Sequence, residues 1–176
     1  MGRLQGLIRP VNRRDDANEP RRGTRNRRTE VRPGSQLTIL DANAFLSLLL
    51  KQPAAPEVSE LLRSQRCAVP VSCVAEVVDR STRVHAISQS AFFKRVSPLV
   101  DDQVVGLPID IPTAQRAGEI RAEHYARVRA PLSLADCFLL ASAEGEDKIA
   151  TADRAVIRVA EQLGIGTIPL LDSQGR

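Results

Sequence analysis

Aromatic residues are scarce in this chain of 176 residues, which contains four phenylalanines, one tyrosine and no tryptophan. Proteins that hold single-stranded nucleic acids often do so with several aromatic side chains on which successive bases stack. The composition therefore argues against a broad base-stacking surface. Any nucleic acid that the protein binds would have to be recognised by its shape.

Histidine and cysteine are also scarce. His85 and His124 do not lie at the spacing of a zinc site, and the three cysteines form no C-x-x-C pair. An odd number of cysteines in a chain without a signal peptide is typical of a reducing compartment. We expect Cys67, Cys73 and Cys137 to be small buried apolar side chains with free thiols.

Long apolar runs are absent as well. None approaches the roughly 18 residues that are needed to span a bilayer. The arginine pairs near the N-terminus are not followed by the apolar region of a Sec or twin-Arg signal. These features predict a cytoplasmic protein with no membrane partner. With 43% hydrophobic and 26% charged residues, the chain has the composition of one ordinary globular domain.

Positive charge is concentrated in residues 1–36, which contain ten arginines and four acidic residues. This segment has almost no apolar periodicity, so it cannot bury enough surface to offset the entropy of ordering and is predicted to be disordered. It could be a basic arm for nucleic acid, a solvated tail, or the product of a start codon assigned too far upstream. Residues 37–176, with 15 basic and 17 acidic residues, are predicted to form one slightly acidic domain.

From residue 37 onwards, segments typical of strands alternate with segments typical of helices. The predicted strands are residues 37–40, 67–71, 104–107, 148–151 and 167–171. The predicted helices are residues 42–52, 56–64, 72–83, 88–100, 113–128, 133–144 and 154–163. Strands separated by helices pair in parallel through right-handed crossovers. The pattern therefore predicts a three-layer α/β/α sandwich around a mostly parallel sheet.

The first predicted helix, residues 42–52, is apolar on all sides because Phe or Leu occupies five positions between 45 and 50. Its end is predicted at Pro53. A helix without a polar face must be covered on both sides. Two sources of cover remain open, namely other parts of the same chain and a dimer partner or bound peptide.

Four acidic residues lie at the junctions of predicted elements. Asp41 ends the first strand, Glu76 lies one turn into the helix after the second, Asp136 begins a helix, and Asp153 follows the fourth strand. Ligands of parallel sheets bind beyond the carboxyl ends of the strands, and the first and fourth strands can be neighbours there. Close carboxylates repel one another unless a cation lies between them, and ligands that are all oxygen favour Mg²⁺ or Mn²⁺.

Three of these acids also have a structural interpretation. Asp136 completes the capping pattern S-x-x-D, Asp153 could cap the helix that follows it, and Glu76 could pair with Arg80 four residues later. Asp41 is harder to explain in this way, because neither a turn nor a cap is obviously needed at its position. Ser72 is predicted to cap the helix that contains Glu76.

The motifs around these acids resemble those of the PIN-domain family and, within it, the VapC-type ribonuclease toxins of bacterial toxin–antitoxin pairs. The similar segments lie between about residues 37 and 172, and they read ILDANAFL, VAEVVDR, LSLADCFLLASA, ATADRAVIRVAEQLGI and TIPLL. The resemblance implies a sheet order of 3-2-1-4-5 and a metal-dependent endoribonuclease. It also implies that four acids bind Mg²⁺ or Mn²⁺ directly or through water: Asp41, Glu76, Asp136 and Asp153.

Further expectations follow from the same resemblance. Asn43 and Thr151 occupy positions at which the family often has small polar residues beside the acids, although Thr151 could equally bond its own backbone. A homodimer is implied, together with a cognate antitoxin whose peptide lies near the first helices. Two alternatives remain, namely a non-catalytic PIN module that binds RNA or protein, and a PIN-like nuclease acting on DNA or in RNA maturation.

Four arginines that precede the third acid are candidates for contacts with RNA phosphates: Arg116, Arg121, Arg127 and Arg129. Such contacts position a nucleic acid without reading its sequence. The alternative is an ordinary solvated helix face, since glutamates are interspersed among the arginines.

Overall fold

The computed structural model describes residues 36–176 apart from 89, 92–93, 95–103 and 127–130. Most of the Arg-rich tail, most of the helix predicted over 88–100, and the candidates Arg127 and Arg129 lie outside the described residues. None of the helices in the described part of the chain is both long and apolar enough to cross a bilayer.

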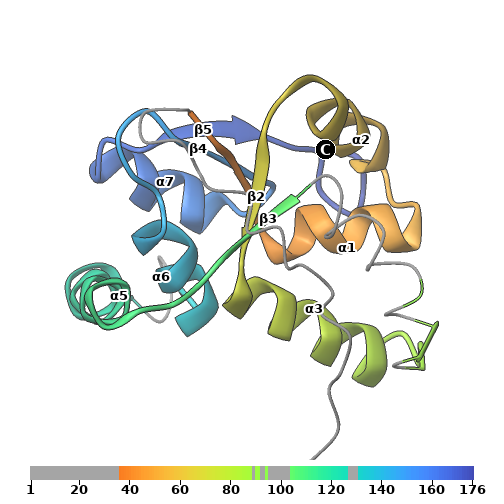
Figure 1. Ribbon diagram of the computed structural model, residues 1–176, viewed down its shortest axis with the longest axis horizontal. Coiled ribbons are helices and arrows are strands. Elements are labelled where there is room, and N and C mark those ends of the chain that lie inside the picture. The colour runs from red at the N-terminus through yellow and green to blue at the C-terminus, as the bar shows by residue number, and fades with distance from the viewer. Residues whose placement is uncertain (1–35, 89, 92–93, 95–103, 127–130) are drawn as a thin grey trace, which may run out of the picture. The chain divides into compact units, whose positions relative to one another are not determined.

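Five parallel strands form a single sheet in the order β3-β2-β1-β4-β5 (Figure 1). The strands are β1 Thr38–Leu40, β2 Cys67–Pro70, β3 Val104–Leu107, β4 Lys148–Thr151 and β5 Gly166–Pro169. The predicted sheet and its order are confirmed. Because β1 and β4 are neighbours, with Leu40 opposite Ala150, the residues that follow these two strands emerge next to each other.

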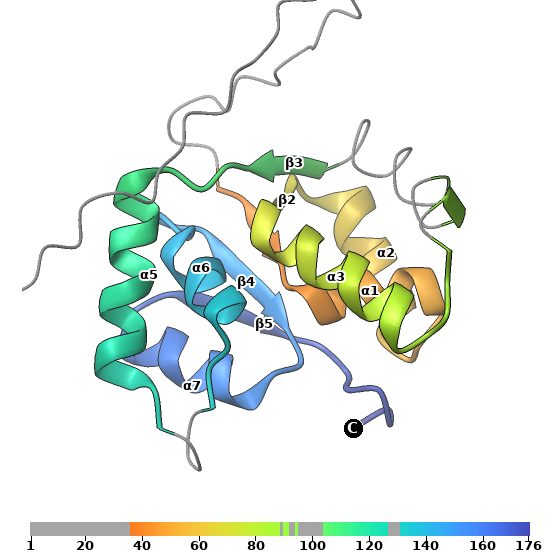
Figure 2. The same cartoon turned by 90° about the horizontal axis from the view of Figure 1, so that it is seen from below.

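Helices cover both faces of the sheet. They are α1 Ala42–Leu50, α2 Ala55–Ser64, α3 Val71–Arg83, α5 Ile111–His124, α6 Leu134–Ala141 and α7 Arg154–Gln162. Figures 1 and 2 show α1, α2 and α3 on one side and α5, α6 and α7 on the other. Right-handed crossovers require this division, because the chain reverses its direction across the sheet after β3. The predicted three-layer sandwich is confirmed.

Two helix ends differ from the prediction. Ser72 does not cap α3, because this helix begins at Val71 and has the extended Pro70 as its N-cap without a side-chain bond. α1 ends at Leu50, before Pro53, because Lys51 adopts a left-handed conformation with φ of 53° and its N–H bonds the carbonyl of Ser47. A left-handed residue at the end of a helix satisfies carbonyls that would otherwise lack a donor.

The apolar helix α1 is covered mainly by its own chain. It packs against α2, α3 and β4, and its buried residues include Phe45, Leu46 and Leu49. Leu48 and Leu50 are only half-buried, so any partner would contact this helix there. The core also contains the three cysteines, which are free and buried as predicted.

Strand β1 is the centre of the core, and its Ile39 is fully buried. We expect Ile39→Ala to lower the free energy of unfolding by about 2–5 kcal/mol, because it leaves a cavity between packed layers. Ile111→Ala is the matched control, since Ile111 is 75% exposed, and should change stability by less than about 0.5 kcal/mol. Chemical denaturation measures both values. Equal effects of the two substitutions would contradict this description of the core.

Candidate active site

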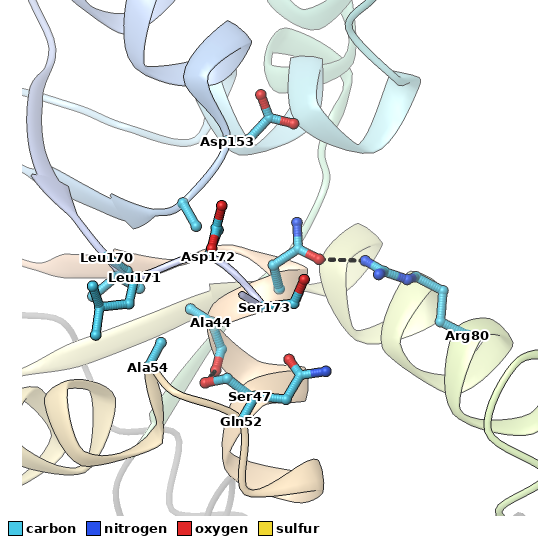
Figure 3. Close-up of a pocket in the computed structure, with 12 residues that line it drawn as sticks. Ala44, Ser47, Gln52, Ala54, Arg80, Asp153, Leu170, Leu171, Asp172 and Ser173 are labelled. Atoms are coloured by element: carbon cyan, nitrogen blue, oxygen red, sulfur yellow. Dashed lines mark hydrogen bonds between the residues drawn. The ribbon is translucent and has the colours of Figure 1, made fainter. Parts of the chain in front are cut away.

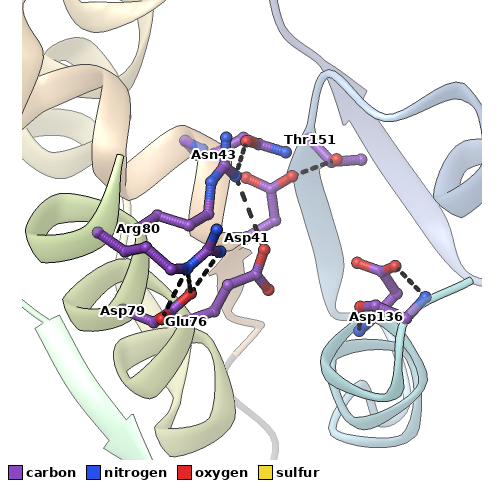
Figure 4. Close-up of polar contacts among 10 residues, drawn as sticks. Asp41, Asn43, Glu76, Asp79, Arg80, Asp136 and Thr151 are labelled. Atoms are coloured by element: carbon purple, nitrogen blue, oxygen red, sulfur yellow. Dashed lines mark hydrogen bonds and ion pairs between the residues drawn. The ribbon is translucent and has the colours of Figure 1, made fainter. Parts of the chain in front are cut away.

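Asp41 lies at the carboxyl end of β1 and is 4% exposed. One carboxylate oxygen accepts a hydrogen bond from the N–H of Ala44, and the other accepts one from the hydroxyl of Thr151 (Figure 4). Asp41 is therefore the N-cap of α1. The interpretation that no cap was needed at this position is wrong.

Burial raises the pKa of Asp41 from 3.8 to about 7. The hydrogen bonds from Thr151 and Ala44 act in the opposite direction, while the negative charges of Asp136 and Asp153 raise the pKa further. A carboxyl in this situation holds its proton at nearly neutral pH. Its ionised form would be favoured by a cation placed among these acids.

Glu76 projects from α3 and is half-buried. Its carboxylate lies 3.7 Å from the guanidinium of Arg80 one turn later, so the predicted ion pair is confirmed. Burial and the charge of Asp136 raise the pKa of Glu76, and Arg80 opposes this rise. The guanidinium of Arg80 also donates a hydrogen bond to the side-chain oxygen of Asn43, which links α3 to α1 (Figure 4).

Asp136 and Asp153 both bond backbone N–H groups at helix N-termini, as their structural interpretation predicted. Ser133 is the N-cap of α6 and Asp136 completes its capping box, while Asp153 is the N-cap of α7 and accepts from the N–H groups of Ala155 and Val156. Each cap uses one carboxylate oxygen, Oδ2 of Asp136 and Oδ1 of Asp153. The other oxygen of each accepts no hydrogen bond from the described residues. Capping and ion binding are therefore compatible roles for these two side chains.

The four acids influence one another without forming a closed cluster. Burial raises the pKa of Asp136, and the charge of Asp153 raises it further. Within the described residues, however, no group of three or more His, Cys, Asp and Glu side chains is close enough to hold a metal ion. Asp136 stands apart from Asp41 and Glu76 in Figure 4. These oxygen donors fit a hydrated divalent cation, because Mg²⁺ keeps several water ligands and takes only one or two carboxylates directly.

Thr151 is completely buried at the end of β4 and connects two of the acids. Its hydroxyl donates to Asp41 and accepts from the backbone N–H of Asp153, the latter at 3.0 Å. Thr151 therefore lies beside an acid and also bonds the backbone two residues further on, so its side chain makes both a site contact and a local backbone contact. It holds the Asp41 carboxylate in place.

Two of the four candidate arginines, Arg116 and Arg121, lie within the described residues. The guanidinium of Arg121 donates a hydrogen bond to the carbonyl of Leu132, which connects α5 to the segment before α6. It also lies 4.6 Å from the centre of the Tyr125 ring. Arg116 is exposed on α5. Arg121 is also close enough to Asp136 for its positive charge to lower the pKa of that carboxyl. Arg80 lies beside Glu76 and Asn43, and the sequence interpretation considered it only as a partner of Glu76. Its position four residues after Glu76, on the same helix face, was the available signal.

A pocket of about 230 Å³ adjoins the acids. Its lining includes Asn43, Arg80 and Asp153, and the remaining walls come from α1, the segment that follows it, Ala152 and residues 170–173 (Figure 3). The pocket and the acidic site therefore share three polar side chains and form one continuous surface.

The pKa of Asp41 makes stability depend on pH. In the folded state the Asp41 carboxyl keeps its proton up to about pH 7, whereas in the unfolded chain it loses the proton near pH 4. The folded state therefore becomes less stable relative to the unfolded state as the pH rises from about 4 to about 7. We therefore expect Asp41→Asn, measured in EDTA, to raise the melting temperature at pH 8 by at least about 3 °C. The gain should shrink as the pH approaches 4. Asparagine is also an effective N-cap.

Asp110→Asn is the matched control for this experiment. Asp110 also caps a helix, but hydrogen bonds from Thr113 hold the pKa of its carboxyl below the usual value. The same substitution there should not raise the melting temperature at pH 8. A gain for Asp41→Asn that is independent of pH would contradict the burial argument.

Several solved structures share this fold. FitAcB from Neisseria gonorrhoeae is 21% identical with a TM-score of 0.52, and the alignment covers 76% of this chain and 96% of that one. DNA-bound VapBC from Salmonella typhimurium is 20% identical with a TM-score of 0.54, covering 77% and 98%. VapBC2 from Rickettsia felis, bound to promoter DNA, is 12% identical with a TM-score of 0.56, covering 77% and 99%. At these identities the likeness establishes a common fold.

The sequence itself carries a family signature. No curated protein matches the chain. A family model described as the PIN domain matches residues 38–162, which include strands β1 to β4, the four acids and Thr151 but not β5. The predicted family resemblance is confirmed. Because the match extends over well more than half of its length, the chain belongs to the PIN domain family.

Proposed function

We propose that this PIN domain is a metal-dependent endoribonuclease that uses Mg²⁺ or Mn²⁺. The observation that carries the proposal is the buried Asp41 carboxylate at the carboxyl end of β1, held by Thr151 from the adjacent strand β4 and close enough to Asp136 and Asp153 for their charges to raise its pKa. Strongly perturbed carboxyls of this kind are typical of functional sites. A non-catalytic module would not need to retain three further acids near one buried carboxyl.

The donors for the cation are oxygen atoms of the four acids. The cation would be held, directly or through water, by Asp41, Asp136 and Asp153. Glu76 would add a fourth negative charge near it. Bound there, such an ion activates a water molecule and neutralises the charge that develops on the phosphate during in-line displacement.

The chain's own residues have distinct tasks in this proposal. The hydroxyl of Thr151 keeps Asp41 oriented. Arg80 provides a positive charge beside the acids and can bind a phosphate oxygen of the RNA. Glu76 is only half-buried and its pKa is raised, so it is suited to exchange a proton with a nearby water.

The biological role proposed here is that of a toxin in a toxin–antitoxin pair. The motifs resemble VapC-type toxins, and the proteins that share the fold include VapBC and FitAcB complexes. A homodimer and a cognate antitoxin that contacts the half-buried face of α1 complete this proposal. We place the protein in the cytoplasm, in keeping with its free thiols. A nuclease acting on DNA or in RNA maturation is the alternative role.

Asp136→Asn tests the chemistry. The substitution keeps a side-chain oxygen for the helix cap but removes a negative charge, so we expect cleavage of structured RNAs in Mg²⁺ or Mn²⁺ to fall by at least about 100-fold. Chelation with EDTA should abolish cleavage by the wild type. The measurement is gel analysis of end-labelled RNA over time.

Glu161→Gln is the control for this test, because it neutralises an exposed acid on α7 at a distance from the site. Its cleavage rate should equal that of the wild type. As a readout independent of catalysis, Mn²⁺ should raise the melting temperature of the wild type and raise that of Asp136→Asn much less. Cleavage that survives both EDTA and Asp136→Asn would refute the metal-dependent mechanism.

The toxin role predicts an effect on growing cells. Induced expression of the wild-type chain in a bacterium should arrest growth, whereas Asp136→Asn should not. Coexpression of a small neighbouring open reading frame that encodes a DNA-binding antitoxin should restore growth, and the purified chain should sediment as a dimer. Normal growth during expression of an active nuclease would favour the processing role.

A further inference from the structure

The pocket beside the acids has the size of a site for one small group. Its volume of about 230 Å³ lies below the roughly 300–1,000 Å³ of pockets that enclose drug-sized ligands. One planar ring system fits such a space, whereas two adjacent nucleotides do not. Figure 3 shows Leu170 and Leu171 on one side of it and Arg80 on the other, and Arg80 bonds Asn43, which also lines the pocket.

The polar groups in the pocket are free to bind a ligand. The side-chain amide of Gln52 and the hydroxyl of Ser173 make no hydrogen bond within the described residues, although both line the pocket. Asn43 uses its side-chain oxygen to accept from Arg80, and its amide donors have no partner among the described residues. The pocket therefore offers both donors and acceptors between apolar walls.

The acids of the pocket make its interior unfavourable for a phosphate. Asp172 lines the pocket, and its carboxylate pairs with the guanidinium of Arg176 at 3.2 Å. Asp153 also lines the pocket. An anion inside the pocket would be repelled by Asp153, whereas a neutral base would not. The one positive side chain of the described pocket wall, Arg80, lies on the side that faces Glu76.

Nucleobases match these properties. RNA-binding proteins commonly read unstacked bases through hydrogen bonds to their edges, and the amides of Asn and Gln form such bonds in pairs. A nucleotide with its phosphate beside Arg80 and the acids would have its base within reach of the pocket, because Asn43, Arg80 and Asp153 belong to both.

We propose that this pocket binds the base of the nucleotide next to the scissile phosphate, and that Gln52 and Ser173 select that base. The proposal rests on the ribonuclease function proposed above and adds a sequence preference to it. RNA shape, which the scarcity of aromatic residues suggested as the sole basis of recognition, is then supplemented by direct reading of one base.

The test is cleavage of an RNA library with a randomised central segment, followed by sequencing of the products. The wild type should favour one base, or one pair of similar bases, at a single position next to the cleaved bond by about tenfold, as expected when a hydrogen-bonded contact discriminates. Gln52→Ala and Ser173→Ala should each reduce this preference several-fold. Gln162→Ala, an exposed glutamine at the far end of α7, is the matched control and should retain it.

A second measurement separates this proposal from the nuclease function. Fluorescence anisotropy in EDTA compares binding of labelled A, C, G and U pentanucleotides to the wild type and to Gln52→Ala. Base-selective binding that Gln52→Ala abolishes supports the pocket even if the wild type cleaves no RNA.

Cleavage without any base preference, or a base preference that survives both substitutions, overturns the pocket proposal and leaves the proposed nuclease function intact. A third outcome is that Gln52→Ala leaves the RNA selectivity unchanged and weakens binding of the antitoxin. That result also overturns the pocket proposal, and it assigns the pocket to a peptide of the antitoxin.

Discussion

The hydrogen bond between the Thr151 hydroxyl and the Asp41 carboxylate is the contact on which the site depends. It joins the carboxyl ends of two adjacent central strands, and both side chains are buried. A buried polar group without a partner is costly, so each of these residues requires the other. In this position Asp41 is close enough to Asp136 and Asp153 for their negative charges to raise its pKa. Fold and site are thus stabilised by one interaction.

Helix capping explains why acids can gather at this edge of the sheet. Asp41 and Asp153 are helix N-caps and Asp136 completes a capping box, and a helix N-terminus carries a partial positive charge that favours a carboxylate. The caps offset part of the repulsion between the acids when no cation is present. A structural and a functional interpretation of the same side chain therefore need not compete.

The fold followed from the sequence because strand-like and helix-like segments alternate regularly, and handedness then limits the topology. The four acids stood out because they lie at the junctions of predicted elements, and the family resemblance then implied a shared role for them. Arg80 was missed as a site residue because an i, i+4 ion pair is usually a solvated surface feature, and its contact with Asn43 depends on how α3 packs against α1. The pocket could not be predicted either, because residues 170–173 reach α1 only in the folded chain.

The distance along the chain between Asp41 and Thr151 has a consequence for biosynthesis. The two residues are separated by 110 positions, and Asp153 follows later still. A ribosome must therefore complete nearly the whole domain before the acids can come together. Under the proposed function, a nascent or prematurely terminated chain would be harmless to the cell that makes it, and nuclease activity would begin only after folding of the finished domain.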